Sequence, residues 1–154
     1  MTIYWQNKTD TKRMAERLAA IVEPGDIICL DGDLGVGKTT FTRYFAQALG
    51  ITAKIKSPTF TIVREYEEGK LPLYHMDAYR LEETGGDDLG IEEYLEGNGV
   101  SIIEWPAFIE EELGENYLWI AIKRVDETTR SLTLTPHGQR ATTLRDQLLE
   151  GKNA

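Results

Sequence analysis

The sequence has little cysteine and no excess of positive charge. Its 154 residues include one cysteine, and 17 Lys and Arg stand against 26 Asp and Glu, for a formal net charge of −9. The lone thiol, Cys29, cannot form an internal disulfide, which is typical of a reducing compartment. A protein that binds nucleic acid unaided normally has the opposite charge balance, because it must neutralise phosphates with Lys and Arg. We therefore do not expect this chain to hold RNA by itself.

Long apolar runs are also missing. Residues 1–8 contain no apolar segment of the kind found in secretion signals, and no stretch is long enough to cross a bilayer. We therefore expect a cytoplasmic protein that makes no membrane contact. The length suits one domain over residues 1–154 with a single core, and a hydrophobic fraction of 41% is ordinary for a globular protein.

Helices and strands alternate in the first third of the chain. A helix is expected to begin near Asp10 or Thr11 and to stop at residues 23–25, where Pro and Gly follow each other. The continuous apolar run over residues 27–31 predicts a strand that is covered on both faces. A second helix follows, with apolar residues at helical spacing and Gly50 at its C-terminal cap.

Residues that favour strands dominate the remainder. We expect hairpins over residues 59–77 and 117–135, a short helix over 91–95, and a buried strand over 100–104 that stops at Trp105-Pro106. A helix lined by Ala141, Leu144, Leu148 and Leu149 follows the second hairpin. This order predicts a three-layer α/β domain whose sheet is mixed and mostly parallel, with antiparallel hairpins.

The strongest motif is a phosphate-binding loop of the form G-x-x-x-x-G-K-[ST]. Glycines in such a loop let successive backbone N–H groups turn toward phosphate oxygens, and the following helix directs the positive end of its dipole there. Lys38 is expected at the β- and γ-phosphates and the Thr39 hydroxyl at Mg²⁺. The motif lies between a predicted buried strand and an amphipathic helix, which is the setting of a P-loop NTPase. Its residues are Gly32, Asp33, Leu34, Gly35, Val36, Gly37, Lys38 and Thr39, with Thr40 next in the chain.

A P-loop protein usually needs an acid at the end of a neighbouring strand to hold Mg²⁺ or its water. Glu104 and Asp77 each end an apolar run. Glu104 follows the more strongly apolar strand and supplies its carboxylate at the carboxyl end, where α/β sheets place ligands. Asp77 could instead cap a turn. We therefore favour Glu104, with Thr39, as the metal-binding pair, and keep Lys38, Asp77 and Glu104 as candidate catalytic residues.

We reject a guanine-recognition motif as the meaning of the string from Asn7 to Asp10. It matches N-K-x-D, but it precedes the phosphate loop, whereas that motif normally follows a late strand of the sheet. A helix N-cap at Thr9 or Asp10 is the better interpretation, and ATP is favoured over GTP. His75 and His137 form no evident metal or triad constellation, and both are expected to be structural or surface residues.

Four strings in this order resemble the TsaE family, formerly YjeE, the bacterial ATPases required to form threonylcarbamoyladenosine in tRNA. The resemblance runs from the predicted helix at Thr11 to about Gly138. None of the strings is rare alone, but their order and spacing together are highly specific. They are Gly32 to Thr40, Ser57-Pro58-Thr59-Phe60-Thr61, Tyr74-His75-Met76-Asp77-Ala78-Tyr79-Arg80-Leu81 and Ile102-Ile103-Glu104-Trp105-Pro106.

The resemblance implies a Mg-ATP site. Thr39 and Glu104 are expected to hold Mg²⁺, and Asp77 is expected near the γ-phosphate or its attacking water. Thr11 falls where the family contacts the nucleotide base. Trp105 is expected beside the metal acid, where it helps to shape the site.

The resemblance also implies a switch-type loop over residues 57–60 that senses the γ-phosphate, with Thr59 as the reporter. The family works with TsaD and TsaB, which carry the threonylcarbamoyl-transfer centre on tRNA. ATP hydrolysis by the family supports repeated turnover, and TsaE itself does not transfer the group. Contact with tRNA is therefore expected only through the complex.

Two alternatives remain. A small-molecule kinase usually closes an Arg-bearing lid over the phosphates, but the corresponding residues 106–116 are acidic and contain no Arg. A sensing module would use bound ATP only to order residues 57–61 for a partner. No residue is required by the sequence to be an arginine finger, although Arg43, Arg64 and Arg80 are candidates. We therefore expect slow intrinsic hydrolysis that a partner accelerates.

Overall fold

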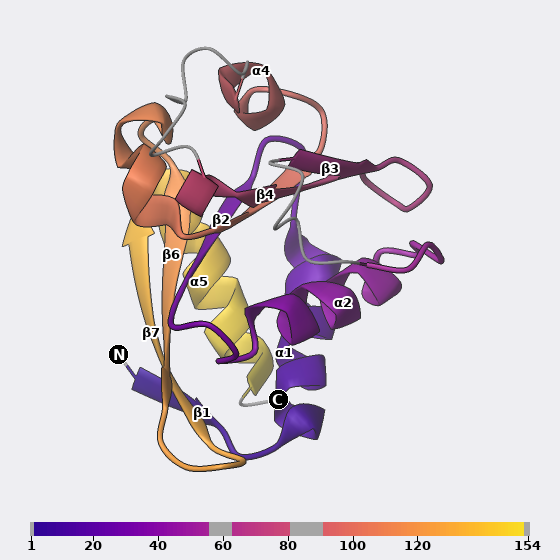
Figure 1. The fold of residues 1–154 in the computed structure, drawn as a ribbon. Coiled ribbons are helices and arrows are strands. Elements are labelled where there is room, and N and C mark those ends of the chain that lie inside the picture. Colours follow the sequence, from indigo (N-terminus) through magenta and orange to yellow (C-terminus); the bar gives the residue numbers. More distant parts are fainter. Residues whose placement is uncertain (1, 56–62, 81–90, 153–154) are drawn as a thin grey trace.

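A central mixed sheet organises the chain, of which a computed structural model describes residues 2–55, 63–80 and 91–152 (Figure 1). Within these residues the sheet has seven strands in the order β1-β7-β6-β2-β5-β4-β3. The elements are β1 (Thr2–Trp5), α1 (Lys8–Ile21), β2 (Ile27–Asp31), α2 (Lys38–Ala48), β3 (Val63–Tyr66), β4 (Leu73–Asp77), η1 (Ala78–Arg80), α4 (Ile91–Leu95), β5 (Val100–Glu104), η3 (Pro106–Glu112), β6 (Tyr117–Arg124), β7 (Arg130–His137) and α5 (Gln139–Lys152).

The strand pairings divide evenly between the two kinds. β2 pairs in parallel with both β5 and β6, and β4 pairs in parallel with β5. The pairs β1–β7, β6–β7 and β3–β4 are antiparallel. The expected mixed sheet is therefore confirmed, but the expectation of a mostly parallel sheet is wrong. The antiparallel pairs come from the two hairpins and from β1, and they lie on either side of the parallel strands at the centre of the sheet.

Most of the predicted elements are present close to their expected positions. β2, α4 and β5 match the predicted strand, short helix and second buried strand, and β6 and β7 form the predicted late hairpin. β3 and β4 confirm the earlier hairpin from Val63 onward, while residues 59–62 lie outside the described part. Gly50, with a φ of 89°, follows the Leu49 cap of α2 as the helix-terminating residue.

Helix α1 begins earlier than predicted. Its N-cap is Asn7, whose Oδ1 accepts a 3.0 Å hydrogen bond from the backbone N–H of Asp10. The Asp10 carboxylate in turn accepts a 2.8 Å bond from the backbone N–H of Gln6. This reciprocal pair satisfies two helix-end donors at once, so the prediction of Thr9 or Asp10 as N-cap is wrong.

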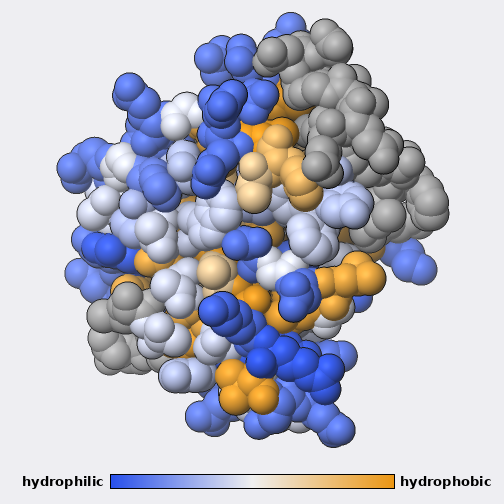
Figure 2. All heavy atoms as spheres, turned by 60° about the vertical axis from the view of Figure 1, so that its left-hand side comes forward, coloured by the Kyte–Doolittle hydropathy of each residue, from blue (hydrophilic) through white to orange (hydrophobic). Residues whose placement is uncertain are grey.

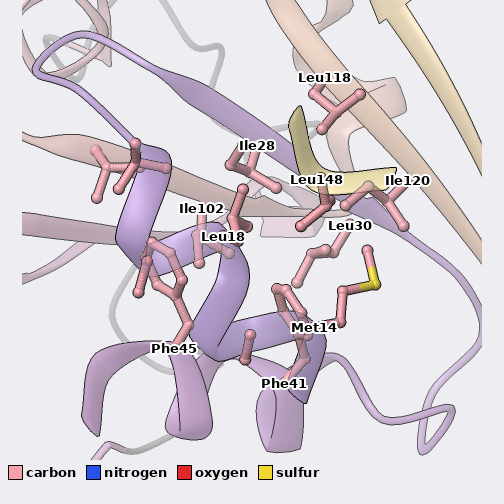
Figure 3. Packing of buried hydrophobic residues seen from close by; sticks show 14 of the residues in the cluster. Met14, Leu18, Ile28, Leu30, Phe41, Phe45, Ile102, Leu118, Ile120 and Leu148 are labelled. Atoms are coloured by element: carbon pink, nitrogen blue, oxygen red, sulfur yellow. The ribbon is translucent and has the colours of Figure 1, made fainter. Parts of the chain in front are cut away.

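The sheet is covered on both faces, which confirms the three-layer arrangement. Helices α1, α2 and α5 bury their apolar residues against one face, in the cluster drawn in Figure 3. On the other face a smaller cluster joins the sheet to α4 and η3. β2 shows why its sequence is apolar throughout, since Ile28 and Leu30 enter the first cluster while Ile27 and Cys29 enter the second.

Cys29 is fully buried on β2, as predicted. Its burial, assisted by the charges of Glu110 and Asp31, raises the pKa of the thiol. None of the described helices is both long and apolar enough to cross a membrane. The face of the molecule seen in Figure 2 is mainly hydrophilic, with apolar areas scattered in small groups.

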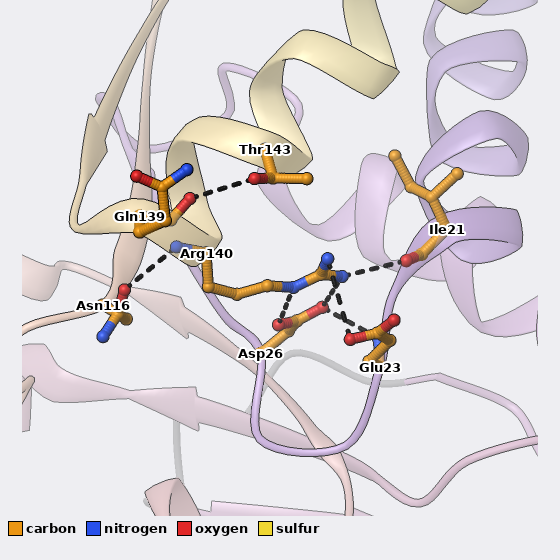
Figure 4. A network of polar contacts seen from close by, with 7 residues as sticks. All are labelled: Ile21, Glu23, Asp26, Asn116, Gln139, Arg140 and Thr143. Atoms are coloured by element: carbon orange, nitrogen blue, oxygen red, sulfur yellow. Dashed lines mark hydrogen bonds and ion pairs between the residues drawn. The ribbon is translucent and has the colours of Figure 1, made fainter.

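An ion pair between the partly exposed Arg140 and the buried Asp26 connects α5 to the turn between α1 and β2 (Figure 4). The Arg140 guanidinium makes two bonds to Asp26, Nε to Oδ1 at 2.9 Å and Nη2 to Oδ2 at 2.8 Å. It also donates to the carbonyl of Ile21, and its backbone N–H donates to Asn116. These bonds lie at the amino ends of the parallel strands, the edge opposite to the one described next.

Candidate functional site

The phosphate loop, Asp77 and Glu104 lie at one edge of the sheet. β2, β4 and β5 run parallel, so their carboxyl ends meet there. Asp77 and Glu104 are register partners on adjacent strands, and Glu104 is also paired with Leu30 near the end of β2. The loop that leaves β2 leads directly into α2. Three segments far apart in the sequence thus converge at one place.

The loop backbone requires glycine for two different reasons, as Gly37 and Gly32 show. Gly37 is the N-cap of α2 and has a φ of 119°, a conformation that other L-residues rarely adopt. At Gly32 the obstacle is space, since a Cβ would lie 2.7 Å from the Ile122 carbonyl oxygen and 2.8 Å from Cγ1 of Val36. The two constraints hold the loop in a tight turn that delivers the first residues of α2 to the cavity.

Arg130 braces this loop from the far end of the sequence. Its Nε donates a 2.9 Å hydrogen bond to the carbonyl of Val36, 94 residues earlier in the chain. Its Nη1 bonds the carbonyls of Asp126 and Thr129 in the β6–β7 turn, so the guanidinium ties that turn to the loop. No sequence motif points to this role, because it depends on the pairing of distant strands.

Lys38 is held within the loop. Its Nζ donates a 2.6 Å hydrogen bond to the Gly32 carbonyl and lies 3.8 Å from the centroid of the Trp105 ring. Burial lowers the pKa of Lys38, and the charges of Glu104 and Asp31 oppose that shift. The side chain is 4% exposed, so its charge acts in surroundings where water screens it poorly.

Trp105 occupies a strained backbone position next to Glu104, the predicted metal ligand. Its φ of 57° and ψ of 49° lie in the left-handed region. No other non-glycine residue in the described part of the chain has a positive φ. The Tyr79 ring lies 5.4 Å from the Trp105 ring and 5.4 Å from that of Phe108. Tyr79 and Trp105 line the cavity, and the Trp105 ring that faces Lys38 packs against Tyr79.

Asp77 and Glu104 are both buried, at 7% and 6% exposure. The Asp77 carboxylate accepts a 3.0 Å bond from the backbone N–H of Tyr79. Burial raises the pKa of Asp77, and the charge of Glu104 adds to the rise, whereas the Tyr79 bond and Lys38 oppose it. A buried carboxyl group with a raised pKa in a cavity is a property expected of a functional site.

These groups line a cavity of about 530 Å³, a size that suits a small-molecule ligand. Of the predicted site residues, it brings together the phosphate loop, both acids and Trp105. Its lining residues are Leu34, Gly35, Gly37, Lys38, Thr39, Thr40, Asp77, Tyr79, Glu104 and Trp105.

A second cavity of about 460 Å³ lies on the other side of the loop and shares Gly35, Gly37 and Thr40 with the first. Thr11, the residue predicted at the nucleotide base, lines it, as does Val36. Sequence reasoning missed its other walls, which come from both ends of the chain: Trp5, Asn7, Lys8, Glu127, Thr128 and Arg130.

His75 is a further residue that the sequence analysis missed. It is fully buried on β4, and its Nε2 lies 2.6 Å from Oε2 of Glu104. The sequence analysis did not anticipate this contact with Glu104, and the burial of His75 agrees with the structural role that was expected. Strand alternation could have found it, because His75 and Asp77 are two residues apart on one strand and so share a face.

Other predicted residues do not reach these cavities. Asp33 lines neither of the two, and its carbonyl accepts a hydrogen bond from the Val36 N–H within the loop. Arg43 and Arg64 line neither cavity, and the side chain of Arg80 lies outside the described part. Thr59 and residues 57–60 also lie outside it, so the predicted switch loop stays a prediction.

The donors present fit a shared Mg²⁺ site better than a closed one. Among the described residues no group of three or more His, Cys, Asp or Glu side chains could hold a metal alone. Thr39 and Glu104 offer one hydroxyl and one carboxylate to the same cavity. Mg²⁺ in nucleotide sites is typically bound by one or two protein oxygens, with phosphates and waters supplying the rest.

Comparison with known proteins gives one consistent result. The family model described as "Threonylcarbamoyl adenosine biosynthesis protein TsaE" matches residues 5–132. The chain is 49% identical over 147 residues to the protein of that name from Bacillus subtilis (strain 168), covering 96% of this chain and 92% of the relative. Its similarity to the Synechocystis protein of the same name is 44% over 110 residues, or 69% and 70% of the two chains.

A solved structure agrees with these matches. The crystal structure titled "Crystal structure of Bacillus subtilus YdiB" superposes with a TM-score of 0.86 at 43% identity, covering 99% of this chain and 95% of that one. The two proteins are therefore similar in sequence as well as in fold.

Proposed function

Because the chain belongs to the TsaE family and so has its role in threonylcarbamoyladenosine (t6A) modification of tRNA, we propose that it is a Mg²⁺-dependent P-loop ATPase. It binds ATP and hydrolyses it slowly, in support of an enzyme complex that modifies the adenosine next to the anticodon. The observation that carries the proposal is the convergence of Lys38, Asp77 and Glu104 on one cavity beside the phosphate loop.

The charges around the cavity support binding of a triphosphate with its metal. Lys38 supplies a buried positive charge to the β- and γ-phosphates. Thr39 and Glu104 hold Mg²⁺, which supplies neutralisation of the phosphate charge. α2 directs its positive end at the same place, since Gly37 is its N-cap.

Asp77 acts as proton acceptor for the attacking water. Its raised pKa makes the carboxylate more basic than an exposed aspartate, which favours transfer of a proton from water. The bond from the Tyr79 N–H fixes one of its oxygens and leaves the other available. Trp105 holds Lys38 against the loop and excludes water from one side of the cavity.

Thr11 and its neighbours receive the base and sugar. The second cavity adjoins the phosphate cavity through Gly35, Gly37 and Thr40, which gives a nucleotide a continuous path between them. Asp10, the residue that would read guanine in an N-K-x-D motif, does not line this cavity. This favours ATP over GTP.

A partner is expected to accelerate hydrolysis. No Arg side chain in the described part of the chain lines the phosphate cavity, and we infer that a partner supplies or organises the charge stabilisation of an arginine finger. TsaD and TsaB are the expected partners, and contact with tRNA is made through them. The net charge of −9 supports an indirect role on RNA.

Substitution of Lys38 or Glu104 tests the proposal. Lys38→Ala and Glu104→Ala should each lose about 10²–10³ in ATPase rate, because each removes a charge that the triphosphate or its metal requires. Both should fail to support repeated t6A formation by TsaD and TsaB. Lys70→Ala and Glu96→Ala, at exposed positions on other elements, are the matched controls. Normal turnover by either site variant contradicts the proposal.

A sensing role without required hydrolysis is the second candidate, and the absence of an Arg from the lining of the phosphate cavity among the described residues favours it. Asp77→Ala separates the two. If ATP binding and t6A formation both survive while hydrolysis is lost, sensing is the function. A small-molecule kinase has less support, because η3 packs Ile109 into the core and carries acidic side chains where a lid would carry Arg.

A further inference from the structure

A short hydrogen bond links the proposed metal acid to a residue that the proposed function leaves without a role. Nε2 of His75 lies 2.6 Å from Oε2 of Glu104, and both side chains are buried. His75 itself does not line the cavity, whereas Glu104 does. His75 therefore acts on the site only through Glu104.

The surroundings of His75 determine which nitrogen carries the proton. Its Nδ1 is buried and has no hydrogen-bond partner among the described residues. The residue opposite it in the β3–β4 register is Arg64, whose side chain can only donate hydrogen bonds. A proton on Nδ1 would thus lack an acceptor, while a proton on Nε2 has the Glu104 carboxylate. The arrangement assigns the proton to Nε2, with Glu104 as acceptor.

Glu104 needs such an anchor because other charges compete for it. Asp77 is its register partner on β4, so the two carboxylates repel each other at close range. Lys38 lines the same cavity, and its positive charge attracts the Glu104 carboxylate. Without an anchor, the Glu104 carboxylate could turn toward Lys38 and form an ion pair with the ammonium group that the phosphates require. A bond to Oε2 from the sheet side prevents this and leaves Oε1, which has no hydrogen bond within the described part, free.

We propose that His75 is a positioning residue for the metal site: its Nε2–H fixes one oxygen of Glu104 and presents the other to Mg²⁺. The inference rests on the proposed function and deepens it, since it states how the metal acid is oriented. Groups that hold a metal ligand in this way typically contribute 10- to 100-fold to metal affinity.

The test compares side chains that differ in where they can place a donor. His75→Gln can put an amide N–H near the position of Nε2, whereas His75→Asn has an amide of shorter reach and His75→Leu has no donor. His137→Leu is the matched control, because His137 stacks on Tyr117 at the opposite edge of the sheet. Circular dichroism checks that each variant folds, and the Asn variant carries the test if the Leu variant does not fold.

The measurement is the dissociation constant of a non-hydrolysable ATP analogue, by calorimetry, in EDTA and in saturating Mg²⁺. In EDTA all variants should bind as the wild type does. In the wild type, Mg²⁺ should increase the affinity for the analogue. The Leu and Asn variants should lose most of this increase, up to about 10- to 100-fold, and Glu104→Gln should lose it as well. The Gln variant should recover most of it.

Three results overturn the inference and can be told apart. If the Leu and Asn variants keep the full gain from Mg²⁺, His75 does not position the metal acid. If the Gln variant loses as much as the Leu variant, the ring matters only for packing. If the wild type itself does not bind the analogue, the proposed function fails and the inference fails with it.

Discussion

At the scale of single residues, the cavity gathers charges that cost the folded chain stability. Asp77 and Glu104 are buried side by side, and Lys38 is the nearest cation. Burial penalises the charged forms of Lys38 and Asp77, so the pKa of Lys38 is lowered and that of Asp77 is raised. Such unfavourable charges are common where a ligand of opposite charge is to be bound.

The first prediction concerns Asp77 and the dependence of stability on pH. Its pKa in the folded chain lies above the ordinary value of 3.8, mainly because of burial. Protonation therefore favours the folded state, and this favourable contribution is lost as pH rises through the folded pKa. Asp77→Asn mimics the protonated form, so it should raise the free energy of unfolding at neutral pH. The gain should shrink toward zero as pH falls below about 4.

Urea denaturation of the wild type and of Asp77→Asn at several pH values measures this difference. Asp146→Asn, at a solvent-exposed position on α5, serves as the control and should change stability little at any pH. A loss of stability in Asp77→Asn at neutral pH would contradict the assignment of burial as the dominant cause.

At the scale of elements, the parallel centre of the sheet was predictable and its margins less so. β2 and β5 are buried on both faces, and this produces the continuous apolar runs that mark them in the sequence. β1 was not predicted. It has four residues, mostly on the surface, and it exists because it pairs with β7 from the other end of the chain. Local periodicity carries no signal for such a strand.

The residues of the candidate site likewise fall into those that the sequence predicts and those that it does not. The phosphate loop, Asp77 and Glu104 are visible in the sequence, because a motif or a strand end marks each of them. Arg130 and His75 were not assigned roles, since each acts on a residue from another element: Arg130 on Val36 and His75 on Glu104. Contacts between distant segments depend on sheet order, which one sequence does not reveal.

The link between α5 and the α1–β2 turn supports the second prediction. Asp26 is buried, and Arg140 is its partner in two short hydrogen bonds. Arg140→Ala would leave the buried carboxylate without its cation, so the free energy of unfolding should fall by about 3 kcal/mol. Chemical denaturation measures this change.

Arg145→Ala is the matched control on the same helix. Arg145 pairs with Asp146 at the surface, where such pairs contribute little, so its loss should cost less than about 0.5 kcal/mol. Equal effects of the two substitutions would show that the Arg140–Asp26 pair does not stabilise the contact between α5 and the α1–β2 turn. ATP binding should survive in both variants, because the pair lies at the edge of the sheet away from the cavities.

At the scale of the whole molecule, the arrangement supports our proposal of a nucleotide-operated component that does not hold RNA by itself. Its sheet brings two adjoining cavities to one edge, and its acidic charge disfavours direct RNA binding. The ordered strings of the sequence already indicated the TsaE family, and the family model and relatives confirm it. The sheet is less parallel than predicted because hairpins and β1 contribute half of its pairings.

The central claim is that this edge of the sheet binds Mg-ATP, and a crystal structure with Mg²⁺ and a non-hydrolysable ATP analogue tests it most directly. We predict the triphosphate on the loop from Gly32 to Thr39, the metal between Thr39 and Glu104, and the base in the cavity that Thr11 lines. A triphosphate bound elsewhere, or a metal that contacts neither Thr39 nor Glu104, would contradict the account.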